Sequence, residues 1–175
     1  MKANQVDISR YIAAIPDWPK KGILFRDITP LLADSAAFAT AVEQLCSGFK
    51  DAGVDYVAAV EARGFIFGSA IAAALGVGFI PIRKKGKLPG RTEAVTYDLE
   101  YGQDTLEVRK DAIAKGANVL MVDDLLATGG TMAAACELIE KIGGTVVGIS
   151  FLIELSELRG REKLAGYSVR AVIKF

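Results

Sequence analysis

The sequence predicts an α/β domain in which helices flank a central, mostly parallel sheet. Short apolar runs of strand length alternate along the chain with longer helix-like runs. The strand-like runs are apolar at nearly every position, which is typical of strands that are covered on both faces. No linker, repeat or low-complexity stretch divides the 175 residues, and this length fits one domain. We therefore expect ligands to bind outside the carboxyl ends of the parallel strands.

The first elements are expected to be helices joined by a loop. Residues 5–14 have a helix-like pattern, and residues 15–22 are predicted to form a loop because two prolines interrupt regular structure. A second helix is expected to begin at Asp34 or Ser35, either of which can cap it, and to run to about Lys50.

The next segment is expected to be a buried strand–helix–strand unit. Strands are predicted at 56–60 and 77–83, with a helix between them at about 65–75. Residues 64–82 carry no charge, and this run is about as long as a membrane-spanning helix. Four glycines and a proline interrupt it, however, so a buried segment is the better interpretation.

Residues 84–108 differ from their surroundings. Their first third is basic and rich in glycine and proline, and the remainder alternates in polarity. This alternation predicts a two-stranded antiparallel excursion with a turn near Gly102. The remaining elements are expected to be a helix at 131–141 and strands at 119–122, 145–155 and 169–175.

The composition excludes several kinds of chemistry. The chain has 21 Lys+Arg, 21 Asp+Glu and no histidine. Catalytic sites with Ser-His-Asp or Cys-His, histidine-ligated zinc and imidazole pH switches are therefore excluded. The zero net charge argues against a protein that coats nucleic acid, although a local basic patch is compatible with it. Cys46 and Cys136 form no CxxC pair and are expected to be reduced core residues.

The N-terminus gives no sign of secretion. It has no apolar core of signal-peptide length before the charged residues Asp7 and Arg10. We therefore expect a soluble, cytoplasmic protein.

One segment carries most of the chemical signal. Residues 119–131 read VLMVDDLLATGGT, with Asp123 and Asp124 where the predicted strand ends. In the loop that follows, glycine lets backbone N–H groups approach an anion, and the helix N-terminus adds partial positive charge. We therefore predict a phosphate site without the lysine of a Walker A loop. Its residues are Ala127, Thr128, Gly129, Gly130 and Thr131.

The two carboxylates indicate what else the ligand carries. Their charges repel a nearby phosphate unless they bind another part of the same ligand. Vicinal ribose hydroxyls donate well to carboxylates, and Mg²⁺ is a second candidate. A ligand with a phosphate beside a diol is a ribose 5-phosphate. The alternative is an ordinary strand-to-helix turn, which does not require two Asp, two Thr and two Gly together.

Five segments together resemble the adenine phosphoribosyltransferase family. VLMVDDLLATGGT is similar to the motif with which type I phosphoribosyltransferases bind phosphoribosyl pyrophosphate (PRPP). The other segments are KGILFRDITPLL (21–32), EARGFIFG (61–68), IRKKGKLPG (82–90) and YDLEYG (97–102). The resemblance covers nearly the whole chain in order. It implies the family's Rossmann-like fold as a single domain, with a small purine-binding hood at 1–34 and a flexible lid loop at 84–102.

The resemblance also implies a reaction. In this family adenine and PRPP give AMP and pyrophosphate, a pentosyl transfer of purine salvage, with Mg²⁺ held mainly by PRPP. The expected partners are adenine, PRPP, AMP, pyrophosphate and a second copy of the chain in a homodimer, with no nucleic acid and no membrane.

Cations are needed for the pyrophosphate. The guanidinium of Arg63 can form bidentate hydrogen bonds with phosphate oxygens. The alternative is that Arg63 forms only a surface ion pair. The resemblance places residues 61–64 in the family's pyrophosphate loop, which often holds a cis peptide before its second residue. By similarity, Arg83, Lys84 and Lys87 also contact pyrophosphate, some of them from the partner subunit. The alternative is that these basic residues belong to a solvated loop without a ligand.

The remaining roles concern adenine. Its proton must leave as it attacks the sugar, and Glu100 matches the family's proposed catalytic glutamate. From its surroundings alone, Glu100 is better interpreted as a solvent-facing strand residue. Phe25 offers a face for stacking, with a plain core position as the alternative. By resemblance, the backbone at Phe25 and Arg26 contacts the exocyclic amine. We expect Leu126 and Ala127 on the other side of the ring.

Two other functions remain open from the sequence. Hypoxanthine, guanine and xanthine phosphoribosyltransferases share the DDxxxTGGT motif, although EARGFIFG and FRDITPLL favour adenine. A non-catalytic regulator that senses PRPP and binds nucleic acid is the third candidate. Such a regulator is expected to carry an added DNA-binding segment and does not need a basic lid or Glu100.

Overall fold

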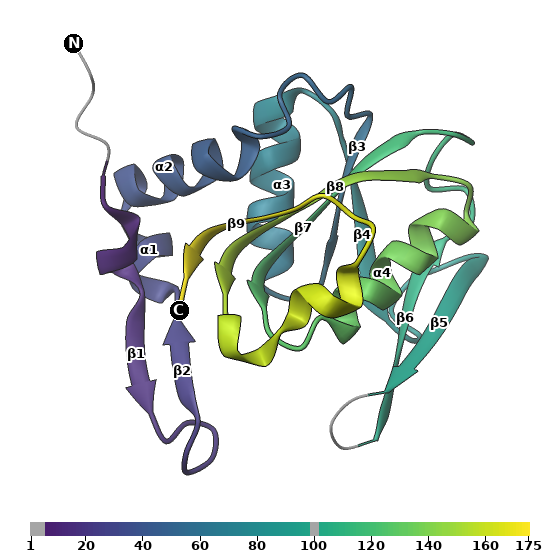
Figure 1. Ribbon diagram of the computed structural model, residues 1–175. Coiled ribbons are helices and arrows are strands. Elements are labelled where there is room, and N and C mark those ends of the chain that lie inside the picture. Colours follow the sequence, from purple (N-terminus) through teal and green to yellow (C-terminus); the bar gives the residue numbers. More distant parts are fainter. Residues whose placement is uncertain (1–5, 99–101) are drawn as a thin grey trace. The chain divides into compact units, whose positions relative to one another are not determined.

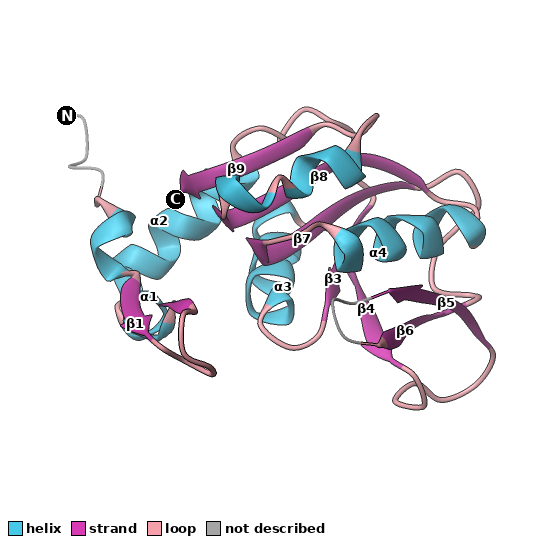
Figure 2. Cartoon of the chain, turned by 60° about the horizontal axis from the view of Figure 1, so that its bottom comes forward, coloured by secondary structure: helices cyan, strands magenta, loops and turns pink. Residues whose placement is uncertain are grey.

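A computed structural model describes residues 6–98 and 102–175. The chain forms two compact units, 1–44 and 45–175, each with its own internal structure. Figure 1 shows the elements in chain order, and Figure 2 shows the same chain turned.

The first unit contains a short antiparallel strand pair and helices. Its elements are the 3-10 helix η1 (Ile8–Tyr11), strands β1 (Ala13–Pro16) and β2 (Leu24–Asp27), and helices α1 (Thr29–Ala33) and α2 (Ser35–Cys46). The helix expected over 5–14 is wrong. The Asp7 side chain accepts a hydrogen bond from Ser9 N, which caps a single short turn, and the chain then becomes extended and pairs with β2. The expected loop at 15–22 is correct except that β1 extends into it to Pro16.

Helix α2 begins where the sequence predicts. Oδ1 of Asp34 accepts the backbone N–H groups of Ala36 and Ala37 at 3.1 and 2.8 Å, so Asp34 caps the helix. Its end was predicted wrongly. The helix stops at Cys46 instead of Lys50, because the chain turns there, with Phe49 N–H donating to the Cys46 carbonyl at 2.9 Å.

The second unit is built on a seven-stranded sheet in the order β5-β6-β4-β3-β7-β8-β9. The four pairs among β3, β4, β7, β8 and β9 are parallel, and β6 is antiparallel to both β4 and β5. This confirms the mostly parallel sheet and the antiparallel excursion; residues 99–101 of its turn lie outside the described residues. The strands are β3 (Tyr56–Val60), β4 (Gly78–Lys84), β5 (Thr92–Asp98), β6 (Gln103–Arg109), β7 (Asn118–Leu126), β8 (Thr145–Glu154) and β9 (Val169–Lys174).

Two helices cover opposite faces of this sheet (Figure 1). Successive strand residues point to opposite faces. Ala58 and Met121 pack in one core with α4 (Gly130–Lys141), whereas Ala59 faces α3 (Gly64–Leu75). The approach of α3 is close, since a Cβ on Gly68 would lie 2.7 Å from the Ala59 Cβ. The uncharged run thus forms α3 and most of β4, and no helix in the described part of the chain combines the length and apolarity needed to cross a bilayer.

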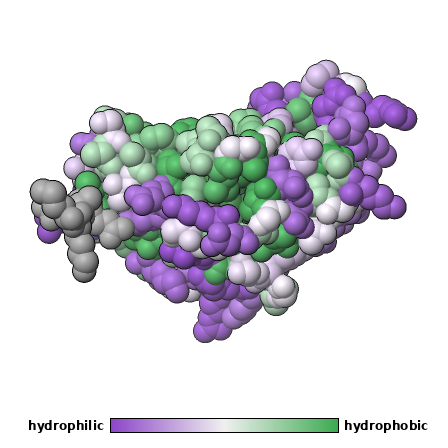
Figure 3. Space-filling model, turned by 90° about the horizontal axis from the view of Figure 1, so that it is seen from above, coloured by the Kyte–Doolittle hydropathy of each residue, from purple (hydrophilic) through white to green (hydrophobic). Residues whose placement is uncertain are grey.

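The link from β8 to β9 contains two short 3-10 helices, η2 (Ser156–Leu158) and η3 (Gly160–Leu164). Both cysteines are free and buried, as the sequence predicts. On the face seen from above in Figure 1, apolar side chains gather in the middle and polar ones around them (Figure 3). The carboxyl ends of the parallel strands point the other way (Figure 1).

Strand β7 is longer than predicted. It was expected to end at Val122, with the two aspartates just beyond it, but it continues to Leu126. The cause is β8, which runs alongside and pairs Asp123 with Phe151 and Leu126 with Glu154. Asp123 and Asp124 therefore belong to a strand, which fixes their backbone.

Candidate functional site

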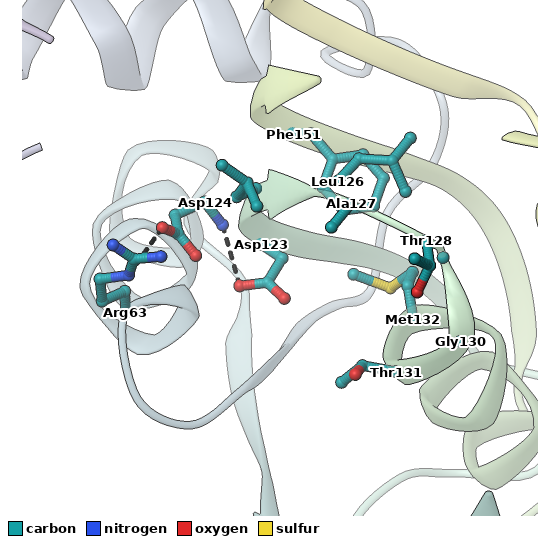
Figure 4. A pocket seen from close by; sticks show the side chains of 12 residues that line it. Arg63, Asp123, Asp124, Leu126, Ala127, Thr128, Gly130, Thr131, Met132 and Phe151 are labelled. Carbon is teal, nitrogen blue, oxygen red and sulfur yellow. Dashed lines mark hydrogen bonds and ion pairs between the residues drawn. The ribbon is translucent and has the colours of Figure 1, made fainter. Parts of the chain in front are cut away.

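A pocket of about 230 Å³ lies where β7 ends and α4 begins. Figure 4 shows its side chains converging from the β3–α3 loop, from the end of β7 and from the start of α4. Most of its lining comes from residues singled out in the sequence. The lining residues are Arg63, Asp123, Asp124, Leu125, Leu126, Ala127, Thr128, Gly129, Gly130, Thr131, Met132 and Phe151.

The predicted phosphate loop leads into α4, and its last two residues, Gly130 and Thr131, begin that helix. Gly129 has φ +81°, a conformation that residues with a side chain rarely adopt, and a Cβ there would overlap the carbonyl oxygen of Gly160. The first backbone N–H groups of a helix have no partner inside that helix, so those at the start of α4 are oriented toward an incoming anion. The side chains of Thr128 and Thr131 lie beside them (Figure 4).

The two carboxylates form a compact pair, in which Asp124 is buried and Asp123 is half-buried. Asp124 is 6% exposed, and its Oδ2 lies 2.8 Å from Nε of Arg63. The two groups form an ion pair by distance, but this oxygen has no hydrogen bond of good geometry among the described residues. Oδ1 of Asp123 accepts the backbone N–H of Asp124 at 2.9 Å (Figure 4). A Cβ on Gly64 would lie 2.7 Å from that oxygen, so glycine leaves the room that Asp123 needs.

The surroundings disfavour negative charge on this pair. Burial raises the pKa of Asp123 well above its usual range, and the adjacent Asp124 raises it further. Burial also raises the pKa of Asp124, although Arg63 opposes the shift. Both carboxylates line the pocket, and Oδ2 of Asp124 is buried without a hydrogen-bond partner among the described residues. A ligand that donates a hydrogen bond to this oxygen would relieve its unfavourable burial.

Of the basic residues predicted for pyrophosphate, Arg63 lines the pocket. The other three, Arg83, Lys84 and Lys87, are not among its lining residues and are paired with carboxylates. Nε and Nη2 of Arg83 donate to Oε2 of Glu61 at 3.0 and 2.9 Å. Nζ of Lys87 lies 3.2 Å from Oε1 of Glu61, and Nζ of Lys84 lies 3.0 Å from Oδ2 of Asp104. Burial opposes ionisation of Glu61, but hydrogen bonds from the Lys84 backbone and from Arg83 and Lys87 outweigh it and lower its pKa.

The loop after β3 has the backbone feature that the resemblance implies. The peptide bond between Glu61 and Ala62 is cis. Glu61 and Arg63 lie on either side of Ala62, and they contact different parts of the second unit. Glu61 contacts the basic residues of β4 and of the segment that follows it, and Arg63 contacts Asp124.

The residues predicted to bind adenine are divided between the two units. Leu126 is 1% exposed and lines the pocket. Phe25 and Arg26 lie on β2 of the first unit, where the Phe25 ring meets Trp18 edge to face with centroids 4.4 Å apart. Glu100 lies outside the described residues.

The sequence does not single out some of the residues that line the pocket or lie beside it. Tyr97 ends close to the phosphate loop, and its hydroxyl accepts from Thr131 Oγ1 at 3.3 Å. Its place at the start of the YDLEYG segment was the available signal. Met132 and Phe151 line the pocket but look like ordinary core residues in the sequence, and nothing there marks them.

A metal would find few protein ligands. Within residues 6–98 and 102–175, no group of three or more Asp, Glu or Cys side chains is placed to hold a metal ion. Asp123 and Asp124 offer carboxylate oxygens, the ligand type that Mg²⁺ prefers, and Asp124 Oδ2 has no hydrogen-bond donor among the described residues. A magnesium ion whose other ligands come from a bound polyphosphate and water is compatible with this donor set.

Comparison with known proteins gives a consistent picture. A family profile for the phosphoribosyl transferase domain matches residues 30–172. The chain is 57% identical to an adenine phosphoribosyltransferase of Clostridium perfringens over 164 residues, 94% of this chain and 95% of that one. It is 53% identical to an adenine phosphoribosyltransferase of Halothermothrix orenii over 169 residues, 97% of this chain and 99% of that one.

Solved structures agree with these relatives. The adenine phosphoribosyltransferase of Thermoanaerobacter pseudethanolicus has a TM-score of 0.93 and 53% identity, covering 96% of this chain and 98% of that one. The Saccharomyces cerevisiae enzyme, solved with D-2,5-dideoxy-2,5-imino-altritol 1,6-bisphosphate and adenine, has a TM-score of 0.89 and 40% identity, covering 94% and 95%.

Proposed function

The chain belongs to the phosphoribosyl transferase family, and we propose that it transfers the phosphoribosyl group of PRPP to N9 of adenine, giving AMP and pyrophosphate. It resembles enzymes of this activity at more than half of its positions and over nearly its whole length. The chain is therefore a pentosyltransferase, and its reaction is one of purine salvage.

One observation carries the assignment of the PRPP site. The carboxylate pair on β7 and the Gly/Thr residues that lead into α4 line the same pocket. Asp123 and Asp124 supply acceptors for the two ribose hydroxyls, while residues 127–131 supply N–H and hydroxyl donors for the 5-phosphate.

The transfer develops positive charge on the sugar carbon as pyrophosphate departs. Ionised Asp123 and Asp124 hold the ribose and place negative charge near that carbon. We assign the leaving pyrophosphate to Arg63, Arg83, Lys84 and Lys87. Because these cations are paired with Asp124, Glu61 and Asp104 in this structure, the proposal requires them to exchange carboxylate partners for phosphate oxygens.

Magnesium fits this scheme as a companion of PRPP. When bound, it neutralises part of the pyrophosphate charge and so eases its departure. The carboxylates of Asp123 and Asp124 would hold it together with the ribose hydroxyls, and PRPP would supply most of the remaining ligands.

The adenine subsite combines residues from three segments of the sequence. Phe25 and Arg26 of the 1–34 hood are assigned to the purine, with Leu126 on the pocket side, and Glu100 is assigned to the proton of N9. The yeast relative was solved with adenine, which supports a purine site in this family of sequences. A homodimer and a cytoplasmic location complete the proposal. Of the lid expected over 84–102, residues 92–98 instead form strand β5, which pairs with β6.

A competition assay tests the choice of base. Adenine, hypoxanthine and guanine are supplied together with PRPP and Mg²⁺, and the nucleotides formed are separated and counted. AMP is the expected main product. Faster formation of IMP or GMP would assign the chain to the 6-oxopurine enzymes, whereas PRPP binding without any product would favour the non-catalytic regulator.

A further inference from the structure

We propose that Lys163 is an additional ligand of the 5-phosphate, contributed by a segment outside the PRPP motif. This inference rests on the proposed function, because it concerns the same substrate. Lys163 lies on η3, more than thirty residues after the phosphate loop in the sequence. Figure 1 shows the segment between β8 and β9 running beside α4, and the two elements are in contact.

Backbone packing fixes η3 against the phosphate loop. A Cβ on Gly129 would overlap the carbonyl oxygen of Gly160, and a Cβ on Gly160 would overlap that of Ala127. Leu164, at the other end of η3, is 1% exposed and belongs to the same core as Met132. The position of η3 is therefore determined on both sides, which fixes the backbone from which Lys163 extends.

The amine of Lys163 lies at the start of α4. Its Nζ is 3.7 Å from the point that a Cβ on Gly130 would occupy. Within the described residues it forms no ion pair, whereas its neighbour Arg161 is paired with Glu154 at 2.7 Å. The carbonyl oxygen of Asp98 lies at the same distance from that point.

The electrostatics of this position favour an anion. The amino end of a helix carries partial positive charge, so a lysine amine beside it is unfavourable unless an anion lies within reach of both. The loop 127–131 contains no charged side chain, and the two aspartates that precede it supply no positive charge. A phosphate dianion bound to the loop would satisfy Lys163 and the helix terminus together, with the lysine acting as a point charge.

Product inhibition separates this role from a structural one. AMP carries the 5-phosphate and pyrophosphate does not, so we compare the inhibition constants of both products in wild type, Lys163→Met, Lys163→Arg and Lys115→Met. Lys115 is the matched control. It lines a cavity at the amino ends of β3, β4 and β7, whereas the phosphate loop follows the carboxyl end of β7. Lys163→Met is expected to raise the inhibition constant of AMP about tenfold and that of pyrophosphate less than twofold. Lys163→Arg is expected to restore most of the AMP affinity, and Lys115→Met to behave as wild type.

Three results would overturn the inference. In the first, Lys163→Met and wild type bind AMP equally, and wild type makes AMP from adenine. The proposed function then holds, and the role of Lys163 fails. In the second, Lys163→Met weakens AMP and pyrophosphate equally, which indicates a general loss of structure. In the third, wild type neither binds AMP nor consumes PRPP, and the proposed function fails with the inference.

Discussion

Nε of Arg63 lies 2.8 Å from Oδ2 of Asp124, so an arginine assigned to pyrophosphate is held by a carboxylate assigned to the ribose. The contact joins the β3–α3 loop to β7 across the pocket. It keeps both side chains beside the position of the reacting sugar carbon in the proposed complex. The arginine also supplies positive charge to a buried carboxylate that has no other cation paired with it among the described residues.

Replacing the carboxylate pair should weaken PRPP binding strongly. Asp123→Asn together with Asp124→Asn keeps the shape of both side chains but removes the charge-assisted acceptors of the ribose hydroxyls. We expect the Kd for PRPP to rise by about 10- to 100-fold, since a hydrogen bond to a charged group contributes about 1.5–3 kcal/mol. Titration calorimetry measures this. Asp111→Asn, which alters an exposed carboxylate paired with Arg109, is the control; equal affinity in all three proteins would remove the ribose role.

The same pair predicts how binding depends on pH. The pKa values of Asp123 and Asp124 are raised, so both groups take up protons at a higher pH than an ordinary aspartate. A protonated carboxyl is a poorer acceptor, and PRPP affinity should therefore fall on acidification while the pH is still above about 4, the usual aspartate pKa. Calorimetry across pH 4.5–8 checks this. The double asparagine variant should lack this part of the pH dependence, and its persistence there would assign it to other groups.

The phosphate loop should not tolerate a side chain at Gly129. Gly129→Ala forces alanine into φ +81° and into the carbonyl oxygen of Gly160. Gly76→Ala is the matched control, because Gly76 also has a positive φ, +70°, but nothing lies within 4 Å of its Cβ position.

Thermal unfolding measures the loss of stability in these variants, and titration with PRPP measures the loss of binding. The control should lose about 1 kcal/mol of stability from backbone strain alone. Gly129→Ala should lose more and should also bind PRPP less tightly. Equal effects of the two substitutions would show that contact with Gly160 is unimportant.

Glu100→Gln should lower turnover far more than affinity. A glutamine cannot accept the proton that leaves N9, yet it preserves size and hydrogen bonding, so kcat should fall while KM for adenine and for PRPP changes little. Steady-state kinetics give both numbers. A parallel loss in kcat and in the affinity for adenine would indicate a binding role in place of proton transfer.

The sequence alone predicted most of the second unit because its signals are local. Uninterrupted apolar runs mark β3 and β7, and Asp34 marks the start of α2. The helix expected at 5–14 failed because pairing between β1 and β2 overrides the local pattern. The length of β7 depends on β8, and the sequence does not encode that pairing locally.

The site shows the same division. The site residues at 123–131 were predicted because the two aspartates and the Gly/Thr residues follow one another in a single stretch of sequence. Phe151, Tyr97 and Lys163 reach the pocket or its loop only through packing of β8, β5 and η3. The partners of Arg83 and Lys87 were equally hidden, since Glu61 meets them across parallel strands.

The central claim is tested most directly by adenine-dependent release of pyrophosphate from PRPP, with and without Mg²⁺, in wild type and in the double asparagine variant. Wild type should release one pyrophosphate for each AMP formed when adenine and Mg²⁺ are present, and the variant should require much more PRPP for the same rate. A wild-type protein that releases no pyrophosphate on addition of adenine would contradict the account.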